Sequence, residues 1–268
     1  MNTIDLKKLQ QTELEVLKHF HQYCTENGLR YYLIGGALLG AARYGGFIPW
    51  DDDIDVTMPR EDYERLKKMY DSSEYFLQNT DSEAKFARCI MKLRKNGTHI
   101  VERCCQHVKM HDGVYIDIFP IDYVAHNSPA ILNKRAKEIR RWWTLRTIKS
   151  GYYGNHMILK TLIRWGIFWL PASAIDKKID KLCTLENGGE RNYAILFLHN
   201  YWWEKQIHEP HVFGDGTVCS FEGEQFIAPS DMHAFLSRVF GEDYMKEPPV
   251  EKQKRPHRYV SLSYDAED

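Results

Sequence analysis

Two adjacent glycines and a group of four aspartates stand close together near the start of the chain. They are Gly35, Gly36, Asp51, Asp52, Asp53 and Asp55, in the segment GGALLGAARYGGFIPWDDDIDV. Residues two apart share one face of a strand, so Asp53 and Asp55 are predicted to project together while Ile54 and Val56 face the core. Neighbouring carboxylates repel each other unless a cation neutralises them, and hard divalent ions prefer oxygen ligands. The pattern indicates a Mg²⁺ site, with Mn²⁺ as the alternative ion; a solvated acidic turn is the simpler alternative and fits the β-branched neighbours poorly.

The glycine pair lies between a predicted strand, Arg30–Ile34, and a predicted helix, Ala37–Tyr44. Glycine lets the backbone approach a ligand closely, and a helix N-terminus presents unpaired N–H groups to a phosphate. Such turns are often purely structural. Beside a metal-binding strand, however, Gly35 and Gly36 indicate a site for the phosphates of a nucleotide.

A third carboxylate, Asp117, lies in a second alternating segment, Gly113–Asp122. The alternation predicts a strand with Asp117 on its polar face, and Pro120 is expected to end that strand. In one sheet with Asp53 and Asp55, Asp117 could serve as a metal ligand, a general base or both. An aspartate on an edge strand that faces water is the alternative, and spacing alone does not separate the two.

The elements around these residues alternate between helix and strand in the first half and are mainly helical afterwards. A helix is predicted from Leu6 to about Asn27, a strand over Asp53–Met58 and a helix from Pro59. Later helices are predicted from Ser128-Pro129 to Gly151, from Ser173 to Asn187-Gly188 and after a Ser230 cap, with a short strand over Tyr193–Leu198 and an extended tail after Pro248. The expected fold class is α+β, with a largely helical C-terminal part.

Bulk composition limits the classes of function. The 268 residues, 43% of them hydrophobic, suffice for one or two domains. The net charge of -1 gives no global field that would steer the protein towards nucleic acid or anionic lipid, so no nucleic-acid partner is expected. Six cysteines without paired short spacings predict reduced thiols and no zinc site. The charged N-terminus lacks the apolar core of a signal peptide, so a cytoplasmic location is expected.

The longest apolar run, Met157–Ala172, is interrupted by Lys160 and Arg164 and stops at Pro171. It is too short and too charged to span a bilayer. A helix buried in the core is the preferred interpretation. Because Trp165 and its aromatic neighbours stand beside basic residues, peripheral contact with a membrane is the alternative.

Three segments together resemble the LicD family of phosphotransferases. They are GALLGAARYGGFIPWDDDIDVTMPREDYERL, YIDIFPID and FGEDYMKEPPVEKQKRPH, at the positions and in the order typical of that family. The resemblance implies a nucleotidyltransferase-like mixed β-sheet core flanked by helices. Residues 1–125 would form this catalytic core with an N-terminal helix, and residues 126–268 would pack on it and complete the donor and acceptor pocket.

The resemblance also implies an activity and a role for each motif residue. Members transfer a phospho-alcohol, best known as phosphocholine from CDP-choline, to a sugar hydroxyl of teichoic acid or lipopolysaccharide and release CMP; relatives use other CDP-alcohols. By this resemblance Gly35 and Gly36 would hold the donor phosphates, and Asp53, Asp55 and Asp117 would be the metal-binding and catalytic carboxylates. Acceptors of this kind are usually lipid-linked, which implies action at the inner face of the membrane.

Further residues are assigned more broadly. Arg43, Arg60 and Lys92, with Arg94, are candidates to supply positive charge to the donor, and surface charge is the ordinary alternative. A choline group would need aromatic faces, for which Trp142-Trp143 and Trp202-Trp203 are visible doublets. His257 lies where members of the family often carry a histidine. A histidine in a C-terminal tail is, however, more often a bystander than a site residue.

Two alternatives to phospho-alcohol transfer keep the same scaffold. One is a nucleotidyltransferase that uses an NTP and releases pyrophosphate. The other is a non-catalytic nucleotide-binding module, against which the presence of all three aspartates counts.

Overall fold

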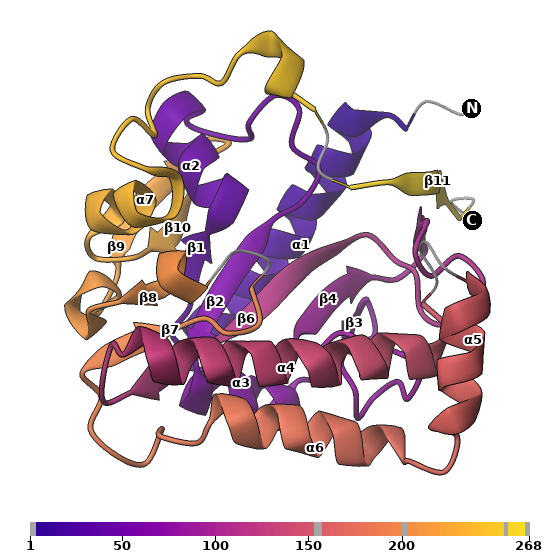
Figure 1. Ribbon diagram of the computed structural model, residues 1–268. Helices are drawn as coiled ribbons and strands as arrows, with labels where there is room; N and C mark the ends of the chain where they lie inside the picture. The colour runs from indigo at the N-terminus through magenta and orange to yellow at the C-terminus, as the bar shows by residue number, and fades with distance from the viewer. Residues whose placement is uncertain (1–3, 153–156, 200–202, 255–256, 266–268) are drawn as a thin grey trace.

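A computed structural model describes residues 4–152, 157–199, 203–254 and 257–265 (Figure 1). Its centre is a seven-stranded mixed sheet whose main path runs β1-β2-β6-β4-β3, with β7 paired to β6 and β8 to β7. These strands are β1 (Tyr32–Ile34), β2 (Asp55–Pro59), β3 (Tyr75–Gln78), β4 (Met91–Lys95), β6 (Tyr115–Val124), β7 (Tyr193–Ile195) and β8 (Ile207–His208). The predicted α+β class is confirmed, because helices and a mixed sheet share one structure.

Seven helices surround this sheet in the described residues. They are α1 (Leu6–Glu26), α2 (Gly35–Tyr44), α3 (Arg60–Met69), α4 (Pro129–Ser150), α5 (Met157–Gly166), α6 (Ala172–Cys183) and α7 (Met232–Phe240). The first helix packs against β4 and β6, and α3 packs against β2 and β6. Figure 1 shows α4 and α6 side by side below the strands, and these two helices are in contact. The apolar faces of these helices and the sheet enclose one main core.

The first helix shows how local sequence sets the boundaries. Asp5 accepts a hydrogen bond from the Lys8 amide at 3.1 Å, which caps the N-terminus. Buried residues recur along one helical face, among them Leu9, Val16 and Phe20. The predicted helix from Leu6 to about Asn27 is therefore confirmed.

The central strand β6 continues through Pro120, so the predicted strand end at that residue is wrong. Pairing with β4 covers Tyr115–Ile118, and pairing with β7 covers Asp122–Val124. Pro120 falls between these two ladders while β6 pairs with β2 on its other side. The missing N–H of proline costs no ladder bond at a position where one neighbouring strand has ended and the next has not begun.

The predicted boundaries of three helices differ from those in the structure. The second helix begins at Gly35, so the glycine pair forms its first turn and does not precede it. The sixth begins at Ala172 and ends at Cys183. The seventh is capped by Asp231, whose carboxylate accepts from the Ala234 amide at 2.8 Å, whereas Ser230 donates to the Phe213 carbonyl.

The C-terminal part contributes two small sheets. The strands β9 (Thr217–Phe221) and β10 (Glu224–Ala228) form a hairpin, and β11 (Tyr259–Tyr264) pairs antiparallel with β5 (Thr98–Glu102). Short 3₁₀ turns cover Trp203–Lys205, Pro210–Val212 and Val250–Lys252. The tail after Pro248 thus folds back as a strand, which the prediction of an extended tail did not include.

The apolar run around α5 lies at the surface, so the preferred interpretation of a buried core helix is wrong. The exposed fraction is 65% for Leu162, 77% for Trp165 and 80% for Phe168. None of the helices in the described part of the chain combines the length and apolarity that crossing a bilayer requires.

Candidate active site

Two of the predicted carboxylates meet at the centre of the sheet. Asp55, the first residue of β2, is paired with Asp117 of the parallel strand β6. Neighbouring strands lie about 4.8 Å apart, and paired residues project from the same face. Asp53 precedes β2, so it approaches from the connecting segment, which differs from the prediction of one strand over Asp53–Met58.

The first turn of α2 lies directly against these acids. Gly35 has φ +60°, and a Cβ atom placed on it would come within 2.8 Å of Asp55 Oδ2. A Cβ atom on Gly36 would come within 2.0 Å of Asp51 Oδ2. Only glycine therefore allows the helix start and the carboxylates to approach this closely.

Burial and mutual repulsion act on the acids of this group. Burial raises the pKa of Asp53 well above its usual value, and the charges of Asp55 and Asp51 raise it further. Burial also raises the pKa of Asp51 to about 7, with added contributions from Asp55 and Asp52. Carboxylates that disfavour one another's charge in this way are suited to a divalent cation.

Atoms of the described acids are also left without partners. Asp52 Oδ2 is buried and has no hydrogen-bond partner. Asp117 Oδ1 is buried without a hydrogen bond as well, and its neighbour is the Lys92 ammonium at 3.2 Å. Buried oxygens of this kind can bind an ion, so the donor set fits Mg²⁺. A three-residue group other than the predicted one also brings possible ligand atoms together, since those of Asp52, Asp53 and His257 all lie within 4.8 Å of one another.

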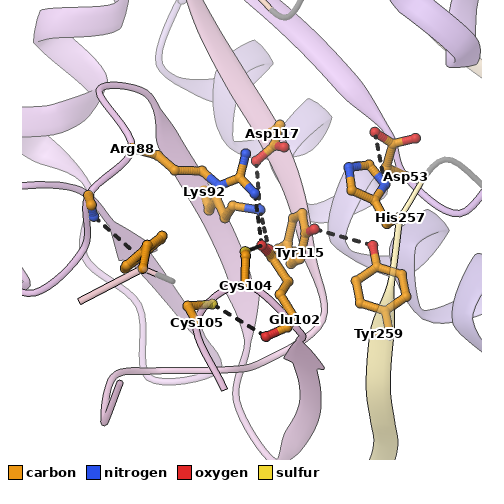
Figure 2. Close-up of polar contacts among 12 residues, drawn as sticks. Asp53, Arg88, Lys92, Glu102, Cys104, Cys105, Tyr115, Asp117, His257 and Tyr259 are labelled. Carbon is orange, nitrogen blue, oxygen red and sulfur yellow. Dashed lines mark hydrogen bonds and ion pairs between the residues drawn. The ribbon is translucent and has the colours of Figure 1, made fainter. Parts of the chain in front are cut away.

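Lys92 is the predicted basic residue that the structure brings to the carboxylates. Its Nζ lies 3.2 Å from Asp117 Oδ1 and 3.0 Å from Glu102 Oε1, and its side chain is fully buried. Figure 2 shows Lys92 between Asp117 and Glu102, with Arg88 on the same glutamate. Burial lowers the pKa of Lys92, while Asp117 and Glu102 oppose that shift. The lysine therefore holds Asp117 from the side of β4.

The other predicted basic residues lie in contacts within the protein. Arg60 starts α3 at the far end of β2 from Asp55 and binds both oxygens of Asp122, at 2.8 and 2.7 Å. Arg43, in the last turn of α2, donates to the carbonyls of Tyr244 and Lys246. Their roles toward a donor stay predictions that this arrangement does not support directly.

Arg94 and the tryptophan doublets also have structural partners. Arg94 is buried and donates to Gln78 Oε1 at 2.6 Å. The indole of Trp143 donates to the Ala87 carbonyl, and that of Trp203 to Asn133 Oδ1. Trp202 lies outside the described residues, so the prediction of an aromatic choline site is not tested there.

Sequence reasoning missed or undervalued two histidines. His257 Nδ1 lies 3.0 Å from Asp52 Oδ1 and 3.8 Å from Asp53 Oδ2, just before β11. Burial lowers the pKa of His257, but Asp52 outweighs that effect and the net shift is upward. His199 Nε2 lies 3.5 Å from Asp55 Oδ2. No local pattern marks His199, because its proximity arises from the turn that follows β7.

A glutamate from the first helix completes the acidic site. Glu13 is 2% exposed, and burial raises its pKa well above the usual value, followed by the charges of Asp52 and Asp51. The sequence signal that could have identified Glu13 is its place on the apolar side of α1.

A second group, Glu102, Cys104 and Cys105, also has possible ligand atoms within 4.8 Å of one another.

The fold and the site together define an α+β protein that gathers buried carboxylates from two parallel central strands beside a helix that begins with glycine. Residues 28–147 match the family model described as LicD/FKTN/FKRP, nucleotidyltransferase domain. The chain is also 30% identical over 265 residues to the lipopolysaccharide cholinephosphotransferase LicD of Haemophilus influenzae, covering 96% of this chain and 97% of that protein. The chain therefore belongs to the LicD family, and it is a phosphotransferase.

A shorter match reaches animal relatives. Over 35 residues the chain is 60% identical to the ribitol 5-phosphate transferase FKRP of Homo sapiens, which is 13% of this chain and 7% of that protein. The same values apply to the FKRP protein of Mus musculus. The resemblance predicted from three motifs is confirmed by these comparisons.

Proposed function

We propose that this protein transfers a phospho-alcohol, in the first instance phosphocholine from CDP-choline, to a sugar hydroxyl of a cell-surface glycan precursor and releases CMP. The observation that carries the proposal is the pairing of Asp55 with Asp117 beside the glycine turn of α2. The names of the relatives support the choice of a phospho-alcohol, since they include cholinephosphate and ribitol phosphate transferases. Teichoic acid and lipopolysaccharide sugars are the acceptor classes, and the precursor is lipid-linked.

The proposed architecture is the nucleotidyltransferase fold. Residues 1–125 supply the acids and the glycine turn, and residues 126–268 complete the pocket for donor and acceptor. Support comes from the mixed sheet and from the matched family description over residues 28–147. The proposed location is the cytoplasm, at the inner face of the membrane, where CDP-alcohols and unfinished glycans meet.

Asp53, Asp55 and Asp117 are proposed to hold Mg²⁺, with Mn²⁺ as the alternative and Asp51 as a neighbouring carboxylate. When bound, the ion neutralises charge on the diphosphate and on the departing CMP. The mutual repulsion of Asp53, Asp55 and Asp51 supports this assignment, because a cation relieves it.

The protein's own groups position the two reactants. Backbone N–H groups at Gly35 and Gly36 donate to oxygens of the diphosphate at the start of α2. Asp117 accepts the proton of the sugar hydroxyl as the oxygen forms its bond to the distal phosphorus. The bond from that phosphorus to the bridging oxygen breaks, and the electron pair leaves with CMP. Lys92 holds the Asp117 carboxylate in place throughout, 3.2 Å away.

The test is incubation of the purified protein with Mg²⁺ and a set of CDP-alcohols that includes CDP-choline, CDP-ribitol and CDP-glycerol. Slow CMP release by hydrolysis, or faster release once a glycan acceptor is added, is the expected result. An inactive Asp117→Asn variant serves as the control. Pyrophosphate release from an NTP in place of CMP release would show the alternative nucleotidyltransferase activity. Failure to bind or cleave any CDP-alcohol would contradict the proposal.

A further inference from the structure

An exposed apolar surface lies on α5 and the turn that follows it, at one edge of the molecule (Figure 1). We call it the α5 patch, and its members are Leu159, Leu162, Trp165, Phe168 and Trp169, with exposed fractions of 58%, 65%, 77%, 80% and 69%. The spacing of Leu159, Leu162 and Trp165 places them along one side of the helix. The half-buried Ile163 lies on another side, and α5 contacts α4. One side of α5 is therefore supported by the protein while its other apolar side is open.

The α5 patch is held in this position by specific contacts. Lys149 Nζ donates to the carbonyls of Ile167 at 3.3 Å and Phe168 at 3.2 Å, at the end of α5. The indole N–H of Trp169 donates to the Gly166 carbonyl at 3.0 Å. These bonds give partners to three carbonyls at the end of α5 and to the Trp169 indole, so the Trp169 ring can enter an apolar medium without a further hydrogen-bond partner.

The exposed charges on α5 and on the second half of α4 are basic. Residues 139–175 contain six lysines and arginines and no aspartate or glutamate, whereas the whole chain carries a net charge of -1. One of the six, Arg146, is buried and ion-paired with Asp176, so it does not contribute to the surface. Arg140 and Arg141 are exposed on α4, and Arg164 is exposed on α5. A positive surface around an apolar centre is complementary to a layer of anionic lipid headgroups.

We infer that the α5 patch inserts into the interface of a membrane that contains anionic lipid. Monomeric proteins rarely leave so many large apolar side chains together in water. Tryptophan is enriched at membrane interfaces, where its ring is apolar and its N–H is polar. The ten-residue helix is about 15 Å long, half of the roughly 30 Å hydrocarbon core, so it lies in the interface plane and does not cross.

A short series of contacts links the end of α4, the helix against which α5 packs, to the carboxylate site. Tyr152, just after α4, accepts from the Ala87 amide at 3.3 Å, and it packs in one cluster with Ala87 and Cys105. Arg88, which follows Ala87 in the chain, pairs with Glu102, and Glu102 also binds Lys92 beside the site. The inference goes beyond the proposed function and does not depend on it, because lipid binding requires neither donor nor acceptor.

The test is flotation of the full-length protein with vesicles of phosphatidylcholine alone or mixed with phosphatidylglycerol. The protein is expected to float with the mixed vesicles and to lose that binding as salt is raised. The triple variant Trp165→Ser, Phe168→Ser, Trp169→Ser is expected to bind at least about tenfold more weakly, because three large apolar side chains no longer insert. The double variant Lys160→Glu, Arg164→Glu is expected to lose the preference for anionic lipid.

The matched control replaces exposed apolar residues elsewhere. Val218, Met245 and Val250 are exposed at 60%, 54% and 76%, and the triple serine variant at these positions is expected to bind vesicles as the parent does. Circular dichroism and thermal unfolding verify that each variant is folded. Flotation of the Trp165, Phe168 and Trp169 variant equal to that of the parent would overturn the inference. So would a folded parent that does not float, or one whose α5 patch instead holds two copies together in gel filtration.

Discussion

Asp55 and Asp117 are direct partners across the parallel strands β2 and β6, although 62 positions of sequence separate them. The pairing places two carboxylates on one face of the sheet, with the start of α2 on one side and Lys92 on the other. Such an arrangement is electrostatically unfavourable by itself, since like charges close together raise each other's pKa values.

Asp55→Asn should abolish phosphotransfer while leaving the protein folded. The variant removes a proposed metal ligand, and a loss of at least about 10²-fold in CMP release is expected. Thermal stability should stay the same or rise, because Asp53 loses a repelling neighbour. Asp71→Asn, at an exposed position, is the matched control and should retain full activity. Parent-like turnover by Asp55→Asn would remove Asp55 from the metal site.

Lys92→Met should destabilise the protein strongly. The fully buried Lys92 ammonium lies between Glu102 and Asp117, so its loss leaves buried negative charge uncompensated. A cost of about 3–5 kcal/mol in the free energy of unfolding is expected, measured by urea denaturation. Lys95→Met is the matched control on the same strand. Its partner Glu15 is half exposed, so its cost should be at most about 1 kcal/mol. Equal costs for the two variants would contradict the assigned role of Lys92.

Local patterns predicted the parts of the fold that short-range chemistry determines. The spacing of apolar residues predicted α1, and the alternation around Asp117 predicted the start of β6. The break expected at Pro120 did not occur, because its cost depends on whether a neighbouring strand needs the N–H at that position. Strand pairing is a long-range property that a single segment does not contain.

The same limit applies to the site and to the surface. Asp55 and Asp117 could be proposed as neighbours, but their direct register follows from the order of the whole sheet. His257 reaches Asp52 across 205 positions through the pairing of β11 with β5. A local pattern could not predict the exposure of α5 either. An apolar helix has the same kind of sequence whether the protein core or another apolar medium covers it.

Gly36→Ala should impair the site more than the fold. The added Cβ would come within 2.0 Å of Asp51 Oδ2, so this carboxylate must move away from the first turn of α2. We expect roughly a tenfold or greater loss of CMP release, because small displacements of a positioning group are costly in catalysis. The free energy of unfolding should change far less than in Lys92→Met, since the atom displaced is at the end of a side chain.

Gly166→Ala is the matched control for Gly36→Ala. No atom lies within 4 Å of a Cβ placed there, and alanine favours a helix over glycine. Activity in solution should remain at the parent level. Equal effects of the two alanine variants would show that the approach of Gly36 to Asp51 has no functional consequence.

His208 should make stability depend on pH, far from the carboxylates. It is 3% exposed, stacks on Phe235 with ring centroids 4.7 Å apart, and neither ring nitrogen has a hydrogen-bond partner. Burial, with a smaller contribution from Arg238, lowers its pKa from 6.5 to about 3. Between these values the unfolded chain binds a proton that the folded protein does not, so stability falls as pH decreases from about 6.5 toward 3.

His208→Phe should remove this part of the pH dependence, which amounts to about 2 kcal/mol at pH 5. Urea denaturation at pH 7.5 and pH 5 measures this difference in the free energy of unfolding, and the exposed His211→Phe is the control. If His208→Phe shows the same difference between the two pH values as the parent, His208 does not titrate on unfolding.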